Sequence, residues 1–190
     1  MNAITGANTL AAAGRRKPRR PGRAASDRER RELAKSSGRS RSRSRPAPVA
    51  EHVTVYVDGG ARAAPRMAAI AHLIVDADGA TLAADASRIG PASAVVAEYT
   101  AMLDGLRHAR RLGLEQIQAR SDCRLLVTHL LGEHTPVNPS LVELGGEIVQ
   151  EIRQFETAIV TWIPSADNDR AHALVSDALA RPSRGRGSSA

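Results

Sequence analysis

Between residues 52 and 180 the chain shows three strand-like runs in succession before its first helix-like run, and strands and helices alternate afterwards. The runs at 52–57 and 66–76 are rich in apolar and β-branched residues, and Asp76-Ala77-Asp78-Gly79 is typical of a hairpin turn that leads into a third run at 80–89. Three sequential strands followed by β/α alternation predict a mixed sheet with helices packed on it, which makes the fold class α/β.

The remaining elements follow from capping residues and from apolar residues at helical spacing. Ser93 is a typical cap for a helix at 94–112, and Gly113 ends that helix. We expect further strands at 115–120 and 157–163, a short helix that Ser121 or Asp122 caps and that ends at Leu131, a helix at 141–155 and a last helix at 168–180 with Asn168 as its cap. The predicted order is βββαβααβα, with five strands and helices on both faces of the sheet.

The charge of the chain is divided unevenly between its ends and its middle. Residues 1–50 contain 14 Lys and Arg against three Asp and Glu, residues 181–190 add three Arg, and residues 51–180 carry ten Arg and 17 acidic residues. Residues 1–50 are rich in Arg, Ser, Pro and Gly, with little apolar surface to bury. We therefore expect a disordered basic arm at 1–50 that attracts phosphates, a folded domain at 51–180 and a disordered basic tail at 181–190. The alternative for both ends is a solubilising or incidental tail.

Three features bear on where the chain works. Its single Cys excludes an internal disulfide and fits a reducing compartment. The longest apolar run, from Ala68 to Val75, is interrupted by His72 and is too short to span a bilayer. The first 14 residues do not read as a secretory signal, and the acidic residues of the arm fit an organellar transit peptide poorly. We therefore expect an intracellular, cytoplasmic protein without membrane contact.

Three acidic residues stand at positions suited to one metal site. Asp58 follows the first strand, Glu98 lies within the first helix, and Asp122 closes the fourth strand. Carboxylates that converge from strand ends and a facing helix suit Mg²⁺ and Mn²⁺, which prefer oxygen ligands. Each position also has an ordinary alternative, as a turn former, a residue near the core face and a helix cap respectively. Taken jointly, the three carboxylates favour a metal site.

Four blocks of sequence carry these residues and the end of the domain: Tyr56-Val57-Asp58-Gly59-Gly60, Ala97-Glu98-Tyr99-Thr100-Ala101-Met102, Ser121-Asp122-Cys123-Arg124-Leu125-Leu126-Val127, and Trp162-Ile163-Pro164 followed by Asn168-Asp169-Arg170-Ala171-His172-Ala173-Leu174. With these blocks, the chain from about His52 to Ala180 resembles the type 1 ribonuclease H family. The resemblance is greatest to the compact branch, which lacks the basic protrusion between helices. Any one block is unspecific, but four in this order within a βββαβααβα pattern are specific to the ribonuclease H-like fold.

The resemblance implies a role for each site residue. Asp58 would bridge two ions, Mg²⁺ or Mn²⁺, Glu98 and Asp122 would hold the ion on the leaving-group side, and His172, in place of a usual fourth carboxylate, would help to hold the other. In this family one ion activates the attacking water and the second stabilises the departing 3′-oxygen. Contacts to nucleic acid are implied for Gly60, Ser93 and Asn168.

The chain departs from the family pattern at three places. His172 supplies nitrogen, which suits Mn²⁺ better than Mg²⁺, or it acts as a general base or proton shuttle. The turn at 61–66 lacks the usual Asn that helps to read the RNA 2′-hydroxyl, and Ser93-Ala94-Val95 stands where the family has Thr-Asn-Asn. Because RNA is told from DNA mainly through the 2′-hydroxyl, these changes bear on substrate selectivity.

These observations favour one function over two alternatives. We expect a metal-dependent endonuclease that hydrolyses the RNA strand of RNA–DNA hybrids and leaves a 5′-phosphate and a 3′-hydroxyl. One alternative is a weak or inactive domain of this fold that binds nucleic acid or a partner protein, and the other is a nuclease for a different structured nucleic acid.

We expect Trp162 and Cys123 to lie in the core, and His129 and His134 have no zinc-finger spacing.

Overall fold

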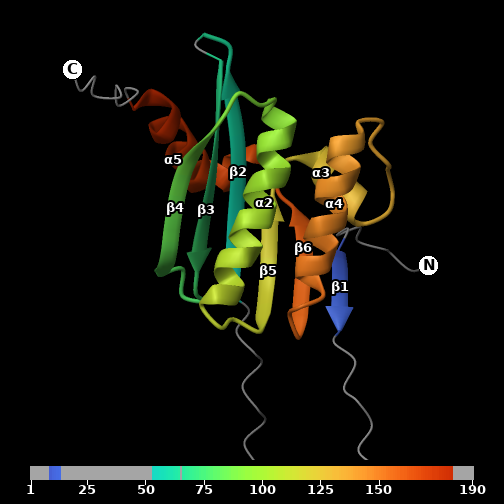
Figure 1. The fold of residues 1–190 in the computed structure, drawn as a ribbon. Coiled ribbons are helices and arrows are strands. Elements are labelled where there is room, and N and C mark those ends of the chain that lie inside the picture. The colour runs from blue at the N-terminus through green and yellow to red at the C-terminus, as the bar shows by residue number, and fades with distance from the viewer. Residues whose placement is uncertain (1–8, 14–52, 65, 182–190) are drawn as a thin grey trace, which may run out of the picture. The chain divides into compact units, whose positions relative to one another are not determined.

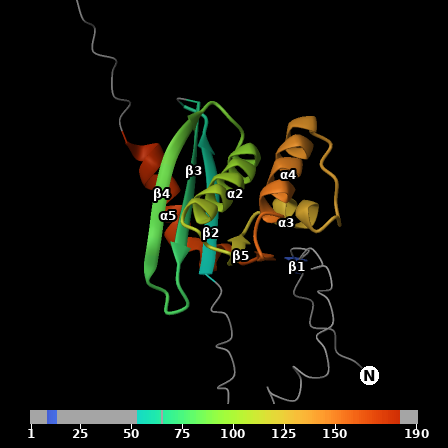
Figure 2. The same ribbon diagram turned by 60° about the horizontal axis from the view of Figure 1, so that its bottom comes forward.

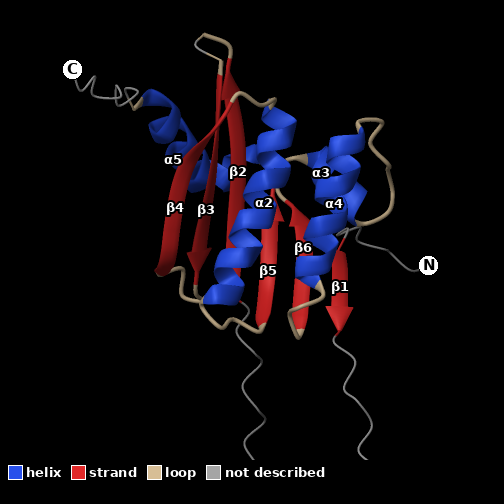
Figure 3. Ribbon diagram, in the orientation of Figure 1, coloured by secondary structure: helices blue, strands red, loops and turns tan. Residues whose placement is uncertain are grey.

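The computed structural model describes residues 9–13, 53–64 and 66–181. Figures 1 and 3 show how strands and helices follow one another in this part of the chain. The strands are β1 (Thr9–Ala13), β2 (Val53–Arg62), β3 (Met67–Val75), β4 (Thr81–Gly90), β5 (Gln116–Ser121) and β6 (Thr157–Trp162). The helices are α2 (Ala94–Arg111), α3 (Arg124–Leu130), α4 (Pro139–Ile152) and α5 (Asp169–Ala180), and the 3₁₀ turn η1 (Ser165–Asn168) precedes α5.

The strands form one mixed sheet in the order β1-β6-β5-β2-β3-β4. β2, β3 and β4 pair antiparallel as successive hairpins, whereas β5 pairs in parallel with both β2 and β6. This arrangement confirms the predicted βββαβααβα order with its five-stranded mixed sheet, to which β1 adds a further strand. Between the predicted strand at 157–163 and the predicted last helix, the chain forms the 3₁₀ turn η1.

Strand β1 is a correction to the predicted disordered arm at 1–50. It pairs antiparallel with β6, from Thr9 beside Thr161 to Ala13 beside Thr157. The first 13 residues carry no charged side chain, in contrast to the Arg-rich sequence that follows. A short uncharged segment can therefore fill the backbone hydrogen bonds that the edge strand β6 leaves open. The rest of the arm and residues 182–190 lie outside the described residues, so their predicted disorder stays a prediction.

Helices cover both faces of the sheet, as the sequence predicts. Figure 2 shows α2, α3 and α4 on one face and α5 on the other. Two adjacent glycines of β2 reflect this division, because side chains alternate between the faces of a strand. A Cβ added at Gly59 would collide with the backbone of α2 at Ala97, and a Cβ at Gly60 would lie 2.8 Å from Cγ1 of Val175 in α5.

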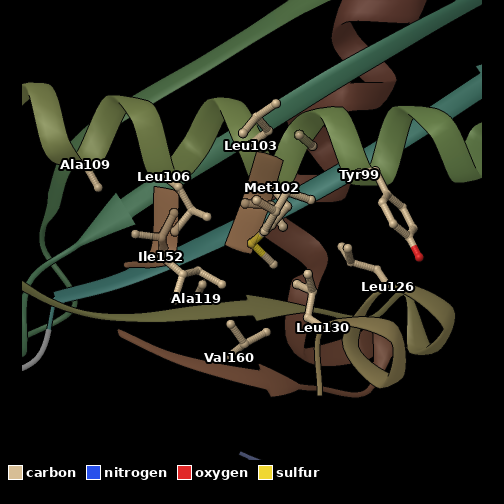
Figure 4. Packing of buried hydrophobic residues seen from close by; sticks show 14 of the residues in the cluster. Tyr99, Met102, Leu103, Leu106, Ala109, Ala119, Leu126, Leu130, Ile152 and Val160 are labelled. Atoms are coloured by element: carbon tan, nitrogen blue, oxygen red, sulfur yellow. The ribbon is translucent and has the colours of Figure 1, made fainter. Parts of the chain in front are cut away.

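The main core lies between the sheet and the three helices α2, α3 and α4. Figure 4 shows side chains of α2, among them Met102 and Leu106, packed against residues of β5, β6, α3 and α4. A smaller cluster on the opposite face joins Ala69 and Ala71 of β3 to Val175 and Ala178 of α5. Because β3 lies between α2 and α5, both of its faces are covered, which explains its almost uninterrupted apolar sequence.

The helix boundaries lie within about three residues of the predicted ones. The side chain of Ser93 accepts a hydrogen bond from the backbone N–H of Val96 at 3.2 Å and caps α2 as expected. Helix α4 begins two residues earlier than predicted, with Pro139 in its first turn and the side chain of Asn138 as its cap. Gly145 lies within α4, and a Cβ there would meet the ring of His129 in α3, so the glycine lets the two helices pack closely with His129 in its present position. Within the described residues, no helix is long and apolar enough to cross a membrane.

Candidate metal centre

Three of the predicted site residues come together at the carboxyl ends of the parallel strands. Asp58 lies in β2, Asp122 directly follows β5, and His172 lies in the first turn of α5. One ligand atom from each of these residues lies within 4.8 Å of the others. In open α/β sheets this end of the strands is where ligands usually bind. The predicted convergence is therefore present for three of the four residues.

The imidazole of His172 lies between the two carboxylates. Its Nδ1 is 3.0 Å from Oδ2 of Asp58, and its Nε2 is 3.2 Å from Oδ2 of Asp122. The hydroxyl of Ser165 lies 2.8 Å from the same Nε2. His172 is about one-third exposed, so a ligand or a nucleic acid can reach it from solvent.

Asn168 fixes Asp122 to the sheet. Its side-chain Nδ2 donates to the backbone oxygen of Val57 and to Oδ1 of Asp122, both at 2.9 Å, and its side chain is buried. Asn168 is the N-cap residue of α5, as predicted, but its side chain makes no capping hydrogen bond, because its amide is turned inward. A buried amide that bridges strand β2 and Asp122 holds the carboxylate in one orientation.

Glu98 lies next to this cluster, on the helix that faces it. It follows Ala97, whose backbone packs directly on Gly59. Burial is the main reason that the pKa of Glu98 rises to about 9, and the charges of Asp58 and Asp122 raise it further. Its Oε2 is buried and has no hydrogen-bond partner among the described residues. An unpaired carboxylate oxygen next to two other carboxylates is costly unless a cation or a proton compensates it.

The other three ionisable groups are shifted in different directions. Burial raises the pKa of Asp58 and outweighs the opposing effect of its hydrogen bond to His172. Burial also acts to raise the pKa of Asp122, but hydrogen bonds from Ser165 and Asn168 and the charge of His172 together lower it. Burial acts to lower the pKa of His172, but its hydrogen bond to Asp58 and the charges of both carboxylates raise it. His172 is therefore held as a cation more readily than a free histidine is.

This donor set fits a divalent cation. Two carboxylates and one imidazole nitrogen converge, and the buried Oε2 of Glu98, next to them, has no hydrogen-bond partner in the part of the chain that the structure describes. The oxygens suit Mg²⁺ or Mn²⁺, and the nitrogen shifts the preference towards Mn²⁺. The fit holds once His172 is deprotonated, because a metal ligand must release its proton.

The three residues predicted to contact nucleic acid lie around this centre. Gly60 is next to Asp58 and packs against α5, Ser93 begins the helix that carries Glu98, and Asn168 binds Asp122. Each of the three residues has a structural role, and their contacts with nucleic acid stay predictions.

Sequence reasoning missed Ser165 and misplaced Trp162. Ser165 lies between the predicted strand at 157–163 and Asn168, and a hydroxyl three residues before Asn168 is the only signal for it in the sequence. Trp162 is 36% exposed and does not belong to the core, because it is the last residue of β6 and lies at the sheet's end. Cys123 is partly buried against the core, and burial raises the pKa of its thiol to about 11, so the thiol is neutral at pH 7.

Comparison with known proteins identifies a matching family and similar relatives. The family described as reverse transcriptase-like matches residues 56–178. The chain is 32% identical over 127 residues to ribonuclease HI of Halobacterium salinarum and 31% identical over 128 residues to a bifunctional protein of Mycobacterium tuberculosis. Each match covers 67% of this chain, and the chain spans 64% and 35% of these relatives' lengths.

Solved structures with a similar fold include ribonuclease H1 enzymes. Ribonuclease H1 of Halobacterium salinarum matches with a TM-score of 0.65 and 32% identity, over 67% of this chain and 97% of that one. A ribonuclease H1 in complex with an RNA/DNA hybrid matches with a TM-score of 0.62 and 30% identity, over 67% and 96% of the two chains. The chain therefore belongs to the reverse transcriptase-like family, and its folded part is a ribonuclease H-like domain.

Proposed function

We propose that this protein is a divalent-metal-dependent endonuclease that hydrolyses the RNA strand of RNA–DNA hybrids. The observation that carries the proposal is the convergence of Asp58, Asp122 and His172 within 4.8 Å, next to a buried oxygen of Glu98 that no described residue pairs with. The similarity to ribonuclease H1 structures, one of them in complex with an RNA/DNA hybrid, supports this choice of substrate.

Each residue has a role that follows from its surroundings. Asp58 and Asp122 would hold the cation, with Asn168 and Ser165 keeping Asp122 ionised and oriented. Glu98 would lose its proton when a cation binds, because the repulsion that raises its pKa would then be offset. A divalent cation held there would supply positive charge and Lewis acidity for hydrolysis of a phosphodiester. His172 would either contribute its nitrogen as a further ligand or accept a proton near the attacking water.

The basic arm would supply affinity for the substrate. Residues 51–180 carry more acidic than basic residues, so by themselves they attract a polyanion poorly. The 14 Lys and Arg of residues 1–50 would offset this repulsion through contacts with phosphates.

A second candidate function is a domain of this fold that binds nucleic acid or a partner protein without cleaving. One observation favours it: the His172 imidazole bridges both carboxylates and has a raised pKa. A protonated His172 offsets the negative charge of the two carboxylates and so opposes metal binding. A third candidate, cleavage of another structured nucleic acid, rests on the missing Asn in the β2–β3 turn.

The deciding experiment is cleavage of a labelled RNA–DNA hybrid in Mg²⁺ and in Mn²⁺, beside double-stranded RNA and double-stranded DNA. We expect cleavage of the RNA strand alone, and we expect Asp58→Asn to lower its rate at least about 100-fold, since even an outer-shell partner of a metal ligand can cost that much. Asp78→Asn, in the exposed β3–β4 turn, removes the same charge far from the centre and should leave the rate unchanged. Wild-type rates in Asp58→Asn would show that the site is misassigned.

The controls separate the candidates. Cleavage of double-stranded RNA with the hybrid left intact would favour the third candidate. Binding of the hybrid without cleavage in either metal would favour the second.

A further inference from the structure

Arg124 and Trp162 form an exposed stacked pair. The guanidinium carbon of Arg124 lies 4.6 Å from the centre of the Trp162 ring, which is a cation–π arrangement. Arg124 is the first residue of α3, and Trp162 is the last residue of β6. Both side chains are exposed, so the pair contributes little to the core.

The pair is fixed to the metal centre by a hydrogen bond. The indole Nε1 of Trp162 donates to the backbone oxygen of Asp122 at 3.0 Å. Arg124 follows Asp122 by two residues, and Trp162 precedes Ser165, the partner of His172, by three. The orientation of the indole ring, and with it the place of the guanidinium, is therefore tied to the same backbone that positions Asp122.

The guanidinium of Arg124 is available to an anion. Other arginines of the domain are occupied: Arg107 and Arg110 pair with glutamates of α4, and Arg88 donates to the last carbonyls of α5. Among the described residues, no carboxylate pairs with Arg124. Stacking covers one face of the guanidinium and leaves its N–H groups free, and these can bind a phosphate with two parallel hydrogen bonds.

We infer that Arg124, held on Trp162, binds a backbone phosphate of the nucleic acid next to the metal centre. The inference rests on the proposed function for its substrate, an RNA–DNA hybrid. A phosphate is a better partner than a base, because Arg124 already covers one face of the indole. The contact also places a fixed cation next to an acidic centre that a polyanion must approach.

The test is the salt dependence of hybrid binding. It is measured in the full chain that carries Asp58→Asn, so that the hybrid is bound without being cleaved. We expect Arg124→Ala to weaken binding about 5- to 10-fold at low salt and to make the slope of log K against log salt shallower by about 0.7 to 0.9, the effect of one phosphate contact. Trp162→Leu keeps the charge but removes its support. It should weaken binding less and leave the slope unchanged.

Arg153→Ala is the matched control, because Arg153 is an exposed arginine that follows α4 at the opposite end of β6. It should change neither affinity nor slope. If Arg124→Ala behaves like Arg153→Ala, or lowers only the melting temperature, the inference is wrong and the pair is structural. In the cleavage-competent chain, Arg124→Ala should raise KM more than it lowers kcat.

The two proposals fail separately. Without any cleavage by the wild-type chain, the proposed function falls, yet a shallower slope in Arg124→Ala would still establish the phosphate contact. Normal cleavage with an unchanged slope would overturn the contact alone.

Discussion

At the scale of single residues, His172 decides what the centre can do. A carboxylate at this position would add negative charge, whereas the imidazole bridges Asp58 and Asp122 and is held as a cation more readily than a free histidine. A proton and a divalent ion held at this site would therefore compete for the same nitrogens. Since the pKa of His172 is raised, this competition extends above the ordinary histidine range near pH 6.5.

Replacing His172→Asp tests this competition. We expect the wild-type chain to cleave faster in Mn²⁺ than in Mg²⁺, and the variant to lower that ratio by roughly tenfold, because an oxygen ligand replaces nitrogen. Activity of the wild type should fall as the pH drops through the raised pKa of His172, and the variant should lose this part of the pH profile. Metal titrations at several pH values measure both effects. An unchanged metal preference would mean that His172 is structural.

At the scale of elements, the contact between β3 and α2 contains a buried histidine. His72 is 1% exposed. Its Nε2 is 2.6 Å from Nδ1 of His108, and its Nδ1 is 3.3 Å from Oδ2 of Asp104, both on α2. Burial is the main cause that lowers the pKa of His72. His108 and Arg111 on α2 also lower it, and Asp104 and Asp85, the latter on β4, act in the opposite sense.

The lowered pKa predicts how stability depends on pH. The unfolded chain binds a proton at this histidine near pH 6.5, and the folded chain binds it only at lower pH. The stabilisation is therefore fully present above pH 6.5 and is lost as the pH falls from there towards the folded-state pKa. We expect His72→Gln to cost about 1–3 kcal/mol at pH 7.5, through unsatisfied buried partners, and to flatten the decline below pH 6.5.

Denaturant titrations between pH 5 and 8 measure this effect. His134→Gln, in the exposed loop after α3, is the matched control and should leave the curve unchanged. An equally steep decline in His72→Gln would assign the acid sensitivity to other groups.

The elements were predictable wherever the signal is local. The strands β2 and β3 follow from β-rich runs, and α2 follows from the Ser93 cap and its helical spacing. Strand β1 was not predictable, because five uncharged residues with three alanines among them become a strand only when the edge of β6 is available.

The residues of the candidate site were predictable from the sequence, but the hydrogen bonds that hold them in place were not. The carboxylates stand in recognisable motifs, but the bond from Asn168 to Asp122 spans 46 residues and competes with an ordinary capping role. Trp162 was misplaced because an aromatic residue in a strand is usually buried, and its exposure depends on where the sheet ends.

At the scale of the whole molecule, charge is divided between sequence regions with opposite signs. Residues 51–180 are acidic and hold the candidate metal centre, whereas residues 14–50 contain every Lys and Arg of the first 50 residues. Substrate affinity and chemistry would thus reside in different parts of the chain.

Deleting residues 1–50 tests this division. We expect hybrid affinity to fall sharply and its salt dependence to flatten, because fewer counterions are released, while turnover at saturating substrate changes little. The deletion also removes β1, so the matched variant keeps the full length and replaces the 14 Lys and Arg by Gln. Filter binding across a salt series should give both variants the same shallow slope. Affinity and slope equal to those of the wild type would reduce the arm to a solubilising tail.

The close packing of Gly59 against α2 limits how this domain can evolve. A carboxylate of the centre can be exchanged for its amide with little change in shape, so activity can be lost by a single substitution while the fold persists. No substitution of Gly59 is tolerated in the same way, because every other side chain would force the helix that carries Glu98 away from the strand that carries Asp58. We therefore expect inactive descendants of such a chain to keep this glycine long after they have lost a metal ligand.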